Sequence, residues 1–62
     1  MSAVQVTCVY HAYEADQLVA TGRLTFNSVP GVGEEVRLNG RPHVIRSVQF
    51  AAGEYVLQLH PK

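Results

Sequence analysis

The chain has 62 residues, of which 47% are hydrophobic and 16% charged, and its five basic and five acidic side chains cancel. This hydrophobic content excludes a disordered chain, and the zero net charge gives no long-range attraction to nucleic acid or to an anionic membrane. A domain of this length buries only about 60% of the surface of its unfolded chain, so we expect a stability of about 3–5 kcal/mol. Residues 1–62 are therefore expected to form one small domain.

The first half of the chain reads as a β-hairpin. Segment 4–13 alternates with a period of two and contains β-branched and aromatic residues, which is typical of a strand. A polar turn at 14–17 follows, and the alternation resumes over 18–26, so we expect a long antiparallel hairpin. The alternative is a short helix over 13–20, with Gly22 just past its end.

A loop and a second hairpin follow. In Pro30-Gly31 the proline pre-sets φ for a turn, and we expect Gly31 to take the positive φ that a type II turn needs next. Segment 35–38 alternates as a short strand. Asn39-Gly40 after it is the strongest short-range hairpin signal, which predicts a two-residue turn with positive φ at both positions.

The fourth strand is expected over 43–50, where Val44 and Val48 share one phase and Ile45 falls on the other. A bulge or strong bend near Arg46-Ser47 would bring both phases inward. After a turn at 51–54 the chain alternates again through Tyr55 to His60. Five strands with short connections predict an all-β fold, a small five-stranded antiparallel meander curling into a partly open barrel. We expect the core to consist of Val6, Cys8, Leu24, Phe26, Val36, Leu38, Val44, Val48, Leu57 and Leu59.

The middle of the chain resembles a known type of barrel. Its pattern is Phe26, Pro30, Gly33-Glu34, Val36, Leu38, Asn39-Gly40, Val44 and Val48. This pattern is similar to the middle of small Src-homology-3-like barrels in bacterial and phage proteins, in which a proline-glycine loop enters a short strand and a bent strand follows a tight turn. The resemblance covers about a third of the chain, implies the fold and carries no functional residue across. The chain has no tryptophan, which argues against the proline-motif binding of the Src-homology class.

The residues that could carry chemistry show no recognisable motif. Cys8 lies on the apolar phase of its strand, and His11 falls on the opposite face, so we expect an unreactive buried thiol. The three histidines have no metal-ligand spacing, and the adjacent Glu34 and Glu35 are poorly placed for acid–base catalysis. We therefore expect no enzyme activity, no metal and no cofactor. A single cysteine and the lack of an apolar run of about 20 residues suit a cytoplasmic protein.

Two functions remain open. The first is a non-catalytic protein-interaction module, which could also self-associate as a homodimer through a sheet edge, because the first strand has neither charge nor proline before Glu14. We expect this strand either to be covered by the C-terminal strand over 55–60, which would close a monomeric barrel, or to pair with a partner. Its candidate residues are apolar ones on the outer phase, Val9, Tyr13 and Val56. The alternative is a nucleic-acid-binding small barrel, in which Arg23, Arg37 and Arg46 would form a basic stripe if they emerged on one face.

Overall fold

The computed structural model describes residues 5–62, so the expected strand start at Val4 lies outside the described residues. The chain forms five strands, β1 (Val6–Glu14), β2 (Gln17–Phe26), β3 (Glu35–Leu38), β4 (Arg41–Ala51) and β5 (Glu54–Pro61). Segment 13–20 is therefore part of a hairpin and not a helix. Across 5–62 there is no helix, and hence none long and apolar enough to cross a membrane.

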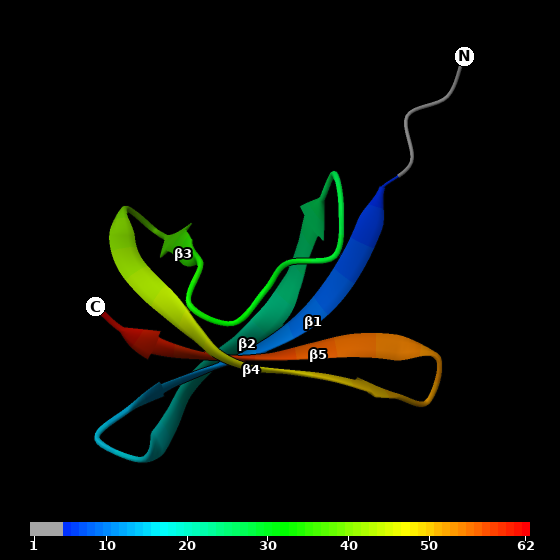
Figure 1. Ribbon diagram of the computed structural model, residues 1–62. Helices are drawn as coiled ribbons and strands as arrows, with labels where there is room; N and C mark the ends of the chain where they lie inside the picture. Colours follow the sequence, from blue (N-terminus) through cyan, green and yellow to red (C-terminus); the bar gives the residue numbers. More distant parts are fainter. Residues whose placement is uncertain (1–4) are drawn as a thin grey trace.

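The five strands form one mixed sheet in the order β2-β1-β5-β4-β3, curled into a half-barrel (Figure 1). β1 and β5 pair in parallel, and the other three pairs are antiparallel. The expected wholly antiparallel meander is wrong in this respect. In a chain of five strands that reverses at each connection, the first and last strands run the same way, so docking them together makes a parallel pair. Over residues 5–62, β2 and β3 do not contact each other, which leaves the barrel open.

Three hairpins close with two-residue turns that have positive φ at both positions. The expected turn at Asn39-Gly40 is confirmed, with φ of 51° and 81°. Ala15-Asp16 and Ala52-Gly53 adopt the same conformation, with φ of 50° and 64° and of 54° and 78°. This type I′ geometry matches the twist of the flanking strands. Alanine is an unfavourable residue in this region, because its Cβ approaches the following carbonyl oxygen.

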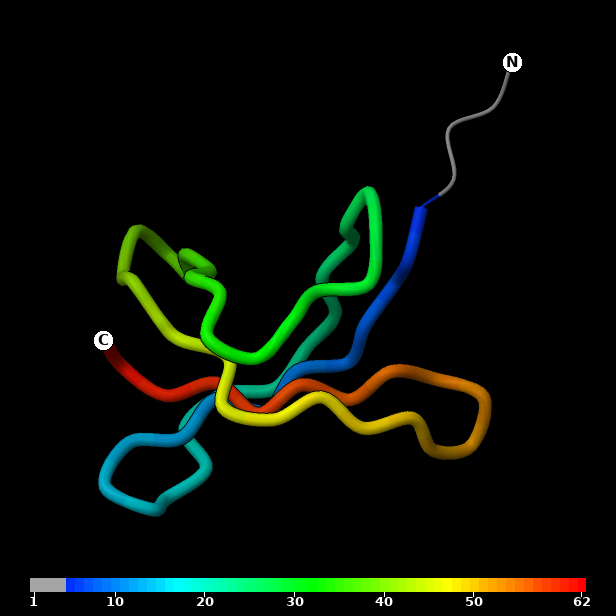
Figure 2. The backbone as a smooth tube through the Cα atoms, viewed as in Figure 1, coloured from blue at the N-terminus to red at the C-terminus, as the bar shows by residue number. Residues whose placement is uncertain are grey.

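The loop between β2 and β3 crosses the sheet on its way to the opposite edge (Figure 2). Its turn differs from the expected one, because positive φ falls at Gly33 (94°) and not at Gly31. The Glu34 N–H donates to the Gly31 carbonyl over 3.3 Å, which makes Gly33 the third residue of the turn. Gly33 N–H also donates to the Ile45 carbonyl (2.9 Å), and Ile45 N–H donates to the Glu34 carbonyl (3.0 Å). These bonds tie the loop to β4 and thereby fix where the turn falls.

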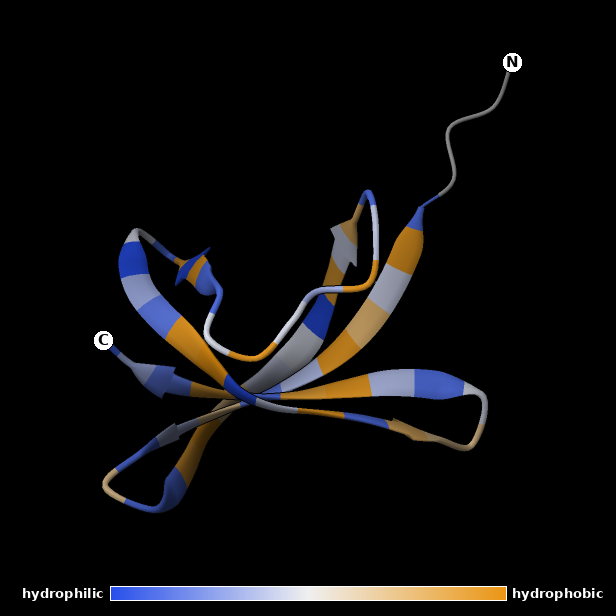
Figure 3. Cartoon of the chain, in the orientation of Figure 1, coloured by the Kyte–Doolittle hydropathy of each residue, from blue (hydrophilic) through white to orange (hydrophobic). Residues whose placement is uncertain are grey.

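The core lies on one face of the sheet, and hydrophobic bands along the central strands β1 and β5 contribute to it (Figure 3). The expected bulge is confirmed, since the β4–β5 register shifts between Ile45 and Ser47. It turns Ile45 inward, where it is fully buried, and leaves Val44 half-buried outside the core cluster, so the expected core position of Val44 is wrong. The expected core is half-buried at Val6, Leu24, Phe26, Val36, Leu38 and Val48. The fully buried apolar residues are Cys8, Ala12, Ile45, Leu57 and Leu59.

A second irregularity lies in the β1–β2 ladder. Tyr13 pairs with Leu18 and Ala12 pairs with Ala20, so Val19 is an extra residue on β2. The extra residue places Leu18, opposite Tyr13, on the outer face and not on the inward face of Leu24 and Phe26, which regular alternation over 18–26 would have given it. Leu18 and Val19 are each 55% exposed as a result.

Gly22 lies directly under an aromatic ring. It pairs with Tyr10 across the ladder. A Cβ added at Gly22 would meet Cε2 and Oη of Tyr10 at 2.9 Å. The absence of a side chain at position 22 therefore gives the Tyr10 ring its place over the sheet, as aromatic residues do across from strand glycines.

Candidate functional site

The expected interaction residues lie on the face of the sheet opposite the core. Val9 and Val56 are register partners in the parallel β1–β5 pair, and both are half-buried. They alternate with the buried Cys8 and Leu57, which places them on the outer face. Tyr13 follows on β1, and its ring stacks on His60 of β5, with 5.6 Å between ring centroids and 20° between planes. The fold thus brings Val9 and Val56 together and places Tyr13 further along the same face.

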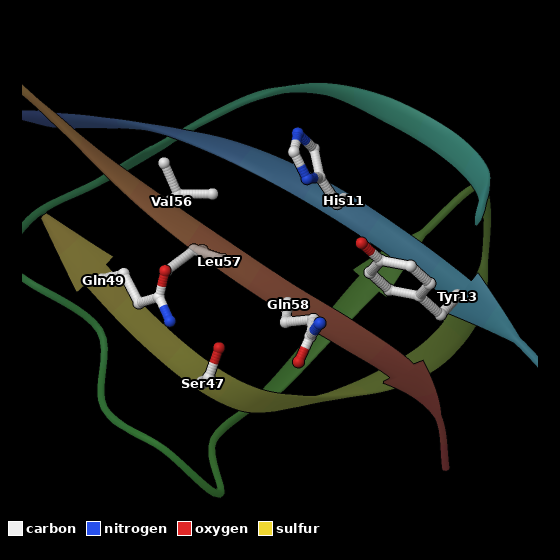
Figure 4. A pocket seen from close by; sticks show the side chains of 7 residues that line it. All are labelled: His11, Tyr13, Ser47, Gln49, Val56, Leu57 and Gln58. Carbon is white, nitrogen blue, oxygen red and sulfur yellow. The ribbon is translucent and has the colours of Figure 1, made fainter. Parts of the chain in front are cut away.

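A shallow groove of about 240 Å³ runs over the outer face across β1, β5 and β4 (Figure 4). None of the residues that line it is an acid, a lysine or an arginine. The groove therefore offers neutral hydrogen-bonding groups and no fixed charge from its walls. It is lined by His11, Tyr13, Ser47, Gln49, Val56, Leu57 and Gln58.

The first strand, expected to be either covered by the C-terminal strand or open to a partner, is covered. β1 lies between β2 and β5 and pairs with both. This is the outcome in which the C-terminal strand covers β1, although the barrel remains open. The free edges of the sheet are β2 and β3.

The edge at β3 is short and charged. Its four residues include Glu35 and Arg37. The Lys62 ammonium donates to the Glu35 carboxylate over 2.7 Å, and this hydrogen bond holds the pKa of Glu35 below its ordinary value. Short length and charge are the features by which natural sheets block edge-to-edge pairing. β3 is therefore a protected edge.

The edge at β2 is long and nearly uncharged. Its ten residues contain one charged side chain, Arg23, and neither proline nor lysine. The Arg23 guanidinium contacts the Glu54 carboxylate at 3.4 Å, with both side chains largely in solvent. None of the ten residues is buried. Apart from the Val19 bulge, β2 carries none of the usual protections of an edge strand.

The backbone of β2 has hydrogen-bonding groups that point away from the sheet. In an antiparallel ladder, alternate residues exchange both backbone bonds with their partner, beginning here with the Glu14–Gln17 pair that flanks the two-residue turn. After the bulge, Thr21, Arg23 and Thr25 direct N–H and C=O outward. Within residues 5–62, the only hydrogen bonds that β2 makes are those of its ladder with β1. No loop backbone group and no side chain bonds to it. These donors and acceptors are available to another strand.

The three arginines of the alternative function do not all come from neighbouring strands, because β1 and β5 lie between the strand of Arg23 and those of Arg46 and Arg37. Arg23 lies on β2 and Arg37 on β3, which are the opposite edges of the sheet. Arg46 lies in the β4 bulge, four residues along from Pro42, the register partner of Arg37. The fold therefore gives no continuous basic stripe of the kind that tracks a nucleic-acid backbone.

The nucleophilic and metal-ligating side chains are dispersed. Cys8 is fully buried, and this burial raises the pKa of its thiol, which disfavours the reactive thiolate. His43 is buried, with Nδ1 3.0 Å from the Arg41 carbonyl, whereas His11 and His60 lie on the outer face. In the part of the chain that the structure describes, no three acidic, histidine or cysteine residues gather as metal ligands would.

Sequence reasoning found the outer-face residues and missed the edge. The low charge of β2 was visible in the sequence, but which strand lies at an edge depends on how the hairpins dock. The chain matches no protein-family model, and no curated protein and no solved structure shows a significant match to it.

Proposed function

We propose that this chain is a small non-catalytic protein-interaction module that binds an extended segment along the edge of β2. One observation carries the proposal: β2 is a ten-residue edge strand with one charge. An extended segment added to such an edge gains main-chain hydrogen bonds, and alternate side-chain contacts then give specificity.

The outer face adds contacts for a bound segment. Leu18 and Val19, each 55% exposed, lie at the start of the edge. Thr21, Arg23 and Thr25 point to the same face as Val9. A strand added to β2 would extend this face, and its side chains would lie beside those of β2.

Two finer assignments belong to this proposal. We assign the half-barrel to the Src-homology-3-like class; its support is the strand order that brings β1 beside β5 and the bulged, bent β4. We also assign the protein to the cytoplasm, where a free thiol such as that of Cys8 is stable.

The test uses a phage-displayed library of random ten-residue peptides selected on the immobilised protein. Selected peptides are then measured against the parent and against Thr21→Pro. The Thr21 N–H points away from β1, so proline removes an edge donor and leaves the β1–β2 ladder intact. We expect Thr21→Pro to lose the binding of most selected peptides.

Arg37→Pro is the matched control, because position 37 holds the equivalent place on the protected edge β3. It should bind the selected peptides like the parent. Far-UV circular dichroism establishes that both variants are folded. Peptides that bind folded Thr21→Pro as tightly as the parent would show that the β2 edge is not the binding element.

A further inference from the structure

We infer that the segment which binds the β2 edge is β2 of a second copy of this chain, paired antiparallel about a two-fold axis at Gly22. The inference rests on the proposed function and names its partner. A second copy presents a segment that is already extended. It therefore does not pay the ordering cost that a flexible peptide pays on binding.

Charge favours this occupant over a charged partner. The whole chain has no net charge, so two copies have no long-range repulsion. The one cation on the edge, Arg23, has Glu54 of its own chain beside it. An edge without excess charge on a neutral protein fits a copy of itself better than an acidic or basic segment.

The symmetry requires a particular kind of register. A two-fold axis perpendicular to the sheet places outer-face residues of one copy opposite outer-face residues of the other. The two core faces then lie on the same side of the combined sheet. Thr21, Arg23 and Thr25 lie on the outer face, opposite His11, Val9 and Thr7 of β1. An axis that passes through Thr21, Gly22 or Arg23 satisfies this condition. Each of these three positions also lets most of β2 pair with β2 of the second copy.

Arg23 and Val19 select among these three centres. An axis at Arg23 would place the two arginines directly opposite each other, which is destabilising. An axis at Thr21 would bring the bulged Val19 into the ladder, opposite Arg23. With the axis at Gly22, Thr21 lies opposite Arg23 of the second copy. By symmetry, Arg23 lies opposite Thr21 of the second copy, so the same contact occurs twice. Val19 then lies beyond the central ladder of residues 20–24.

The register makes two substitutions at one position change association in opposite directions. Thr21→Lys places a cation opposite Arg23 of the second copy, and the symmetry gives two such repulsive pairs in each dimer. We expect the dimer dissociation constant to rise about tenfold. Thr21→Glu places an anion there, and we expect the constant to fall several-fold. Thr7→Lys makes the same charge change on the exposed outer face of β1, one strand in from the edge and outside the pairing between the two copies, and should leave the constant unchanged.

Sedimentation velocity from about 10 μM to about 1 mM measures the association, since an interface this small is weak. The amide signals of Thr21 and Arg23 should shift with concentration in the same range. A parent that stays monomeric throughout overturns the inference, and so does a Thr21→Lys effect matched by Thr7→Lys or a Thr21→Glu effect of the same sign. If the parent is monomeric but Thr21→Pro still loses the binding of the selected peptides, the inference fails and the proposed function stands. If the peptides bind Thr21→Pro as tightly as the parent, both the inference and the proposed function fail.

Discussion

Replacing Gly22 with alanine should destabilise the protein when Tyr10 is present and stabilise it when Tyr10 is replaced by alanine. The added Cβ would lie 2.9 Å from Cε2 and Oη of Tyr10 and 3.1 Å from Cζ. These atoms form the outer end of the ring, so the ring would rotate away from the sheet. Tyr10 packs against the buried core. Returning about 80 Å² of its apolar surface to water costs about 2 kcal/mol at about 25 cal/mol per Å².

Alanine also has a favourable effect at this position, because a strand glycine loses more backbone entropy on folding, by about 0.5–1 kcal/mol. In the parent, Gly22→Ala should therefore destabilise the protein by about 1 kcal/mol. In a Tyr10→Ala background there is no ring to displace, and Gly22→Ala should stabilise by about 0.5–1 kcal/mol. The coupling between the two positions is then about 2 kcal/mol, within the range for residues in contact.

Urea denaturation followed by far-UV circular dichroism measures all four proteins. Sulfate, added equally to each, keeps the weaker variants folded at zero urea. Additive effects, with Gly22→Ala destabilising by the same amount whether or not Tyr10 is present, would show that the ring does not occupy the space above Gly22. A stabilising Gly22→Ala in the parent would refute the same reasoning.

Three further outcomes are expected. Ala52→Asn should stabilise by about 0.5–1 kcal/mol, because asparagine tolerates the φ of 54° better than alanine, and Asn39→Ala should destabilise by a similar amount; urea midpoints that do not move in opposite directions would contradict this. Ile45→Ala should cost about 2–5 kcal/mol, because the side chain is fully buried, and a melting temperature within a few degrees of the parent would rule that out. In Lys62→Met the pKa of Glu35 should rise toward its ordinary value, which carboxyl titration by NMR would show. Because the pKa of Glu35 is lower in the folded protein than in the unfolded chain, the stability that Lys62 adds should be present above the unfolded pKa. It should vanish as pH falls through the folded pKa, so acid unfolding of the parent and of Lys62→Met should converge there.

The local elements of this fold were predictable because local chemistry determines them. Asn39-Gly40 tolerates positive φ at both positions, so the turn forms there whatever surrounds it. The irregularity near Arg46 was visible as a change of apolar phase between Ile45 and Val48, which a bulge or a strong bend would bring inward together, and the structure has the bulge.

The remaining features depend on contacts that local sequence does not encode. Gly31 and Gly33 are equally able to take positive φ, and the hydrogen bonds of Gly33 and Glu34 to Ile45 decide between them. The exposure of Leu18 follows from the Val19 bulge, for which the regular alternation of 18–26 gave no sign. The lack of charge in β1 left two outcomes open, a covered strand or a binding edge, and the docking of β5 against β1 decides for the first and leaves β2 at the edge.

The parallel ladder between β1 and β5 has a consequence for how the protein folds. Cys8 pairs with Tyr55 and Ala12 with Leu59, so this ladder joins segments separated by most of the chain, while every antiparallel pair joins strands that are consecutive in sequence. The hairpins can form early by local loop closure, within microseconds, but they gain a shared core only when the first and last strands meet. We therefore expect folding on a millisecond-to-second timescale, with the barrier set by the search of the preformed β1–β2 hairpin and the preformed β3–β4–β5 meander for each other. Because the hairpin tips are already formed at this barrier, substitutions there should slow folding, as should those in the part of the β1–β5 ladder that forms at the barrier.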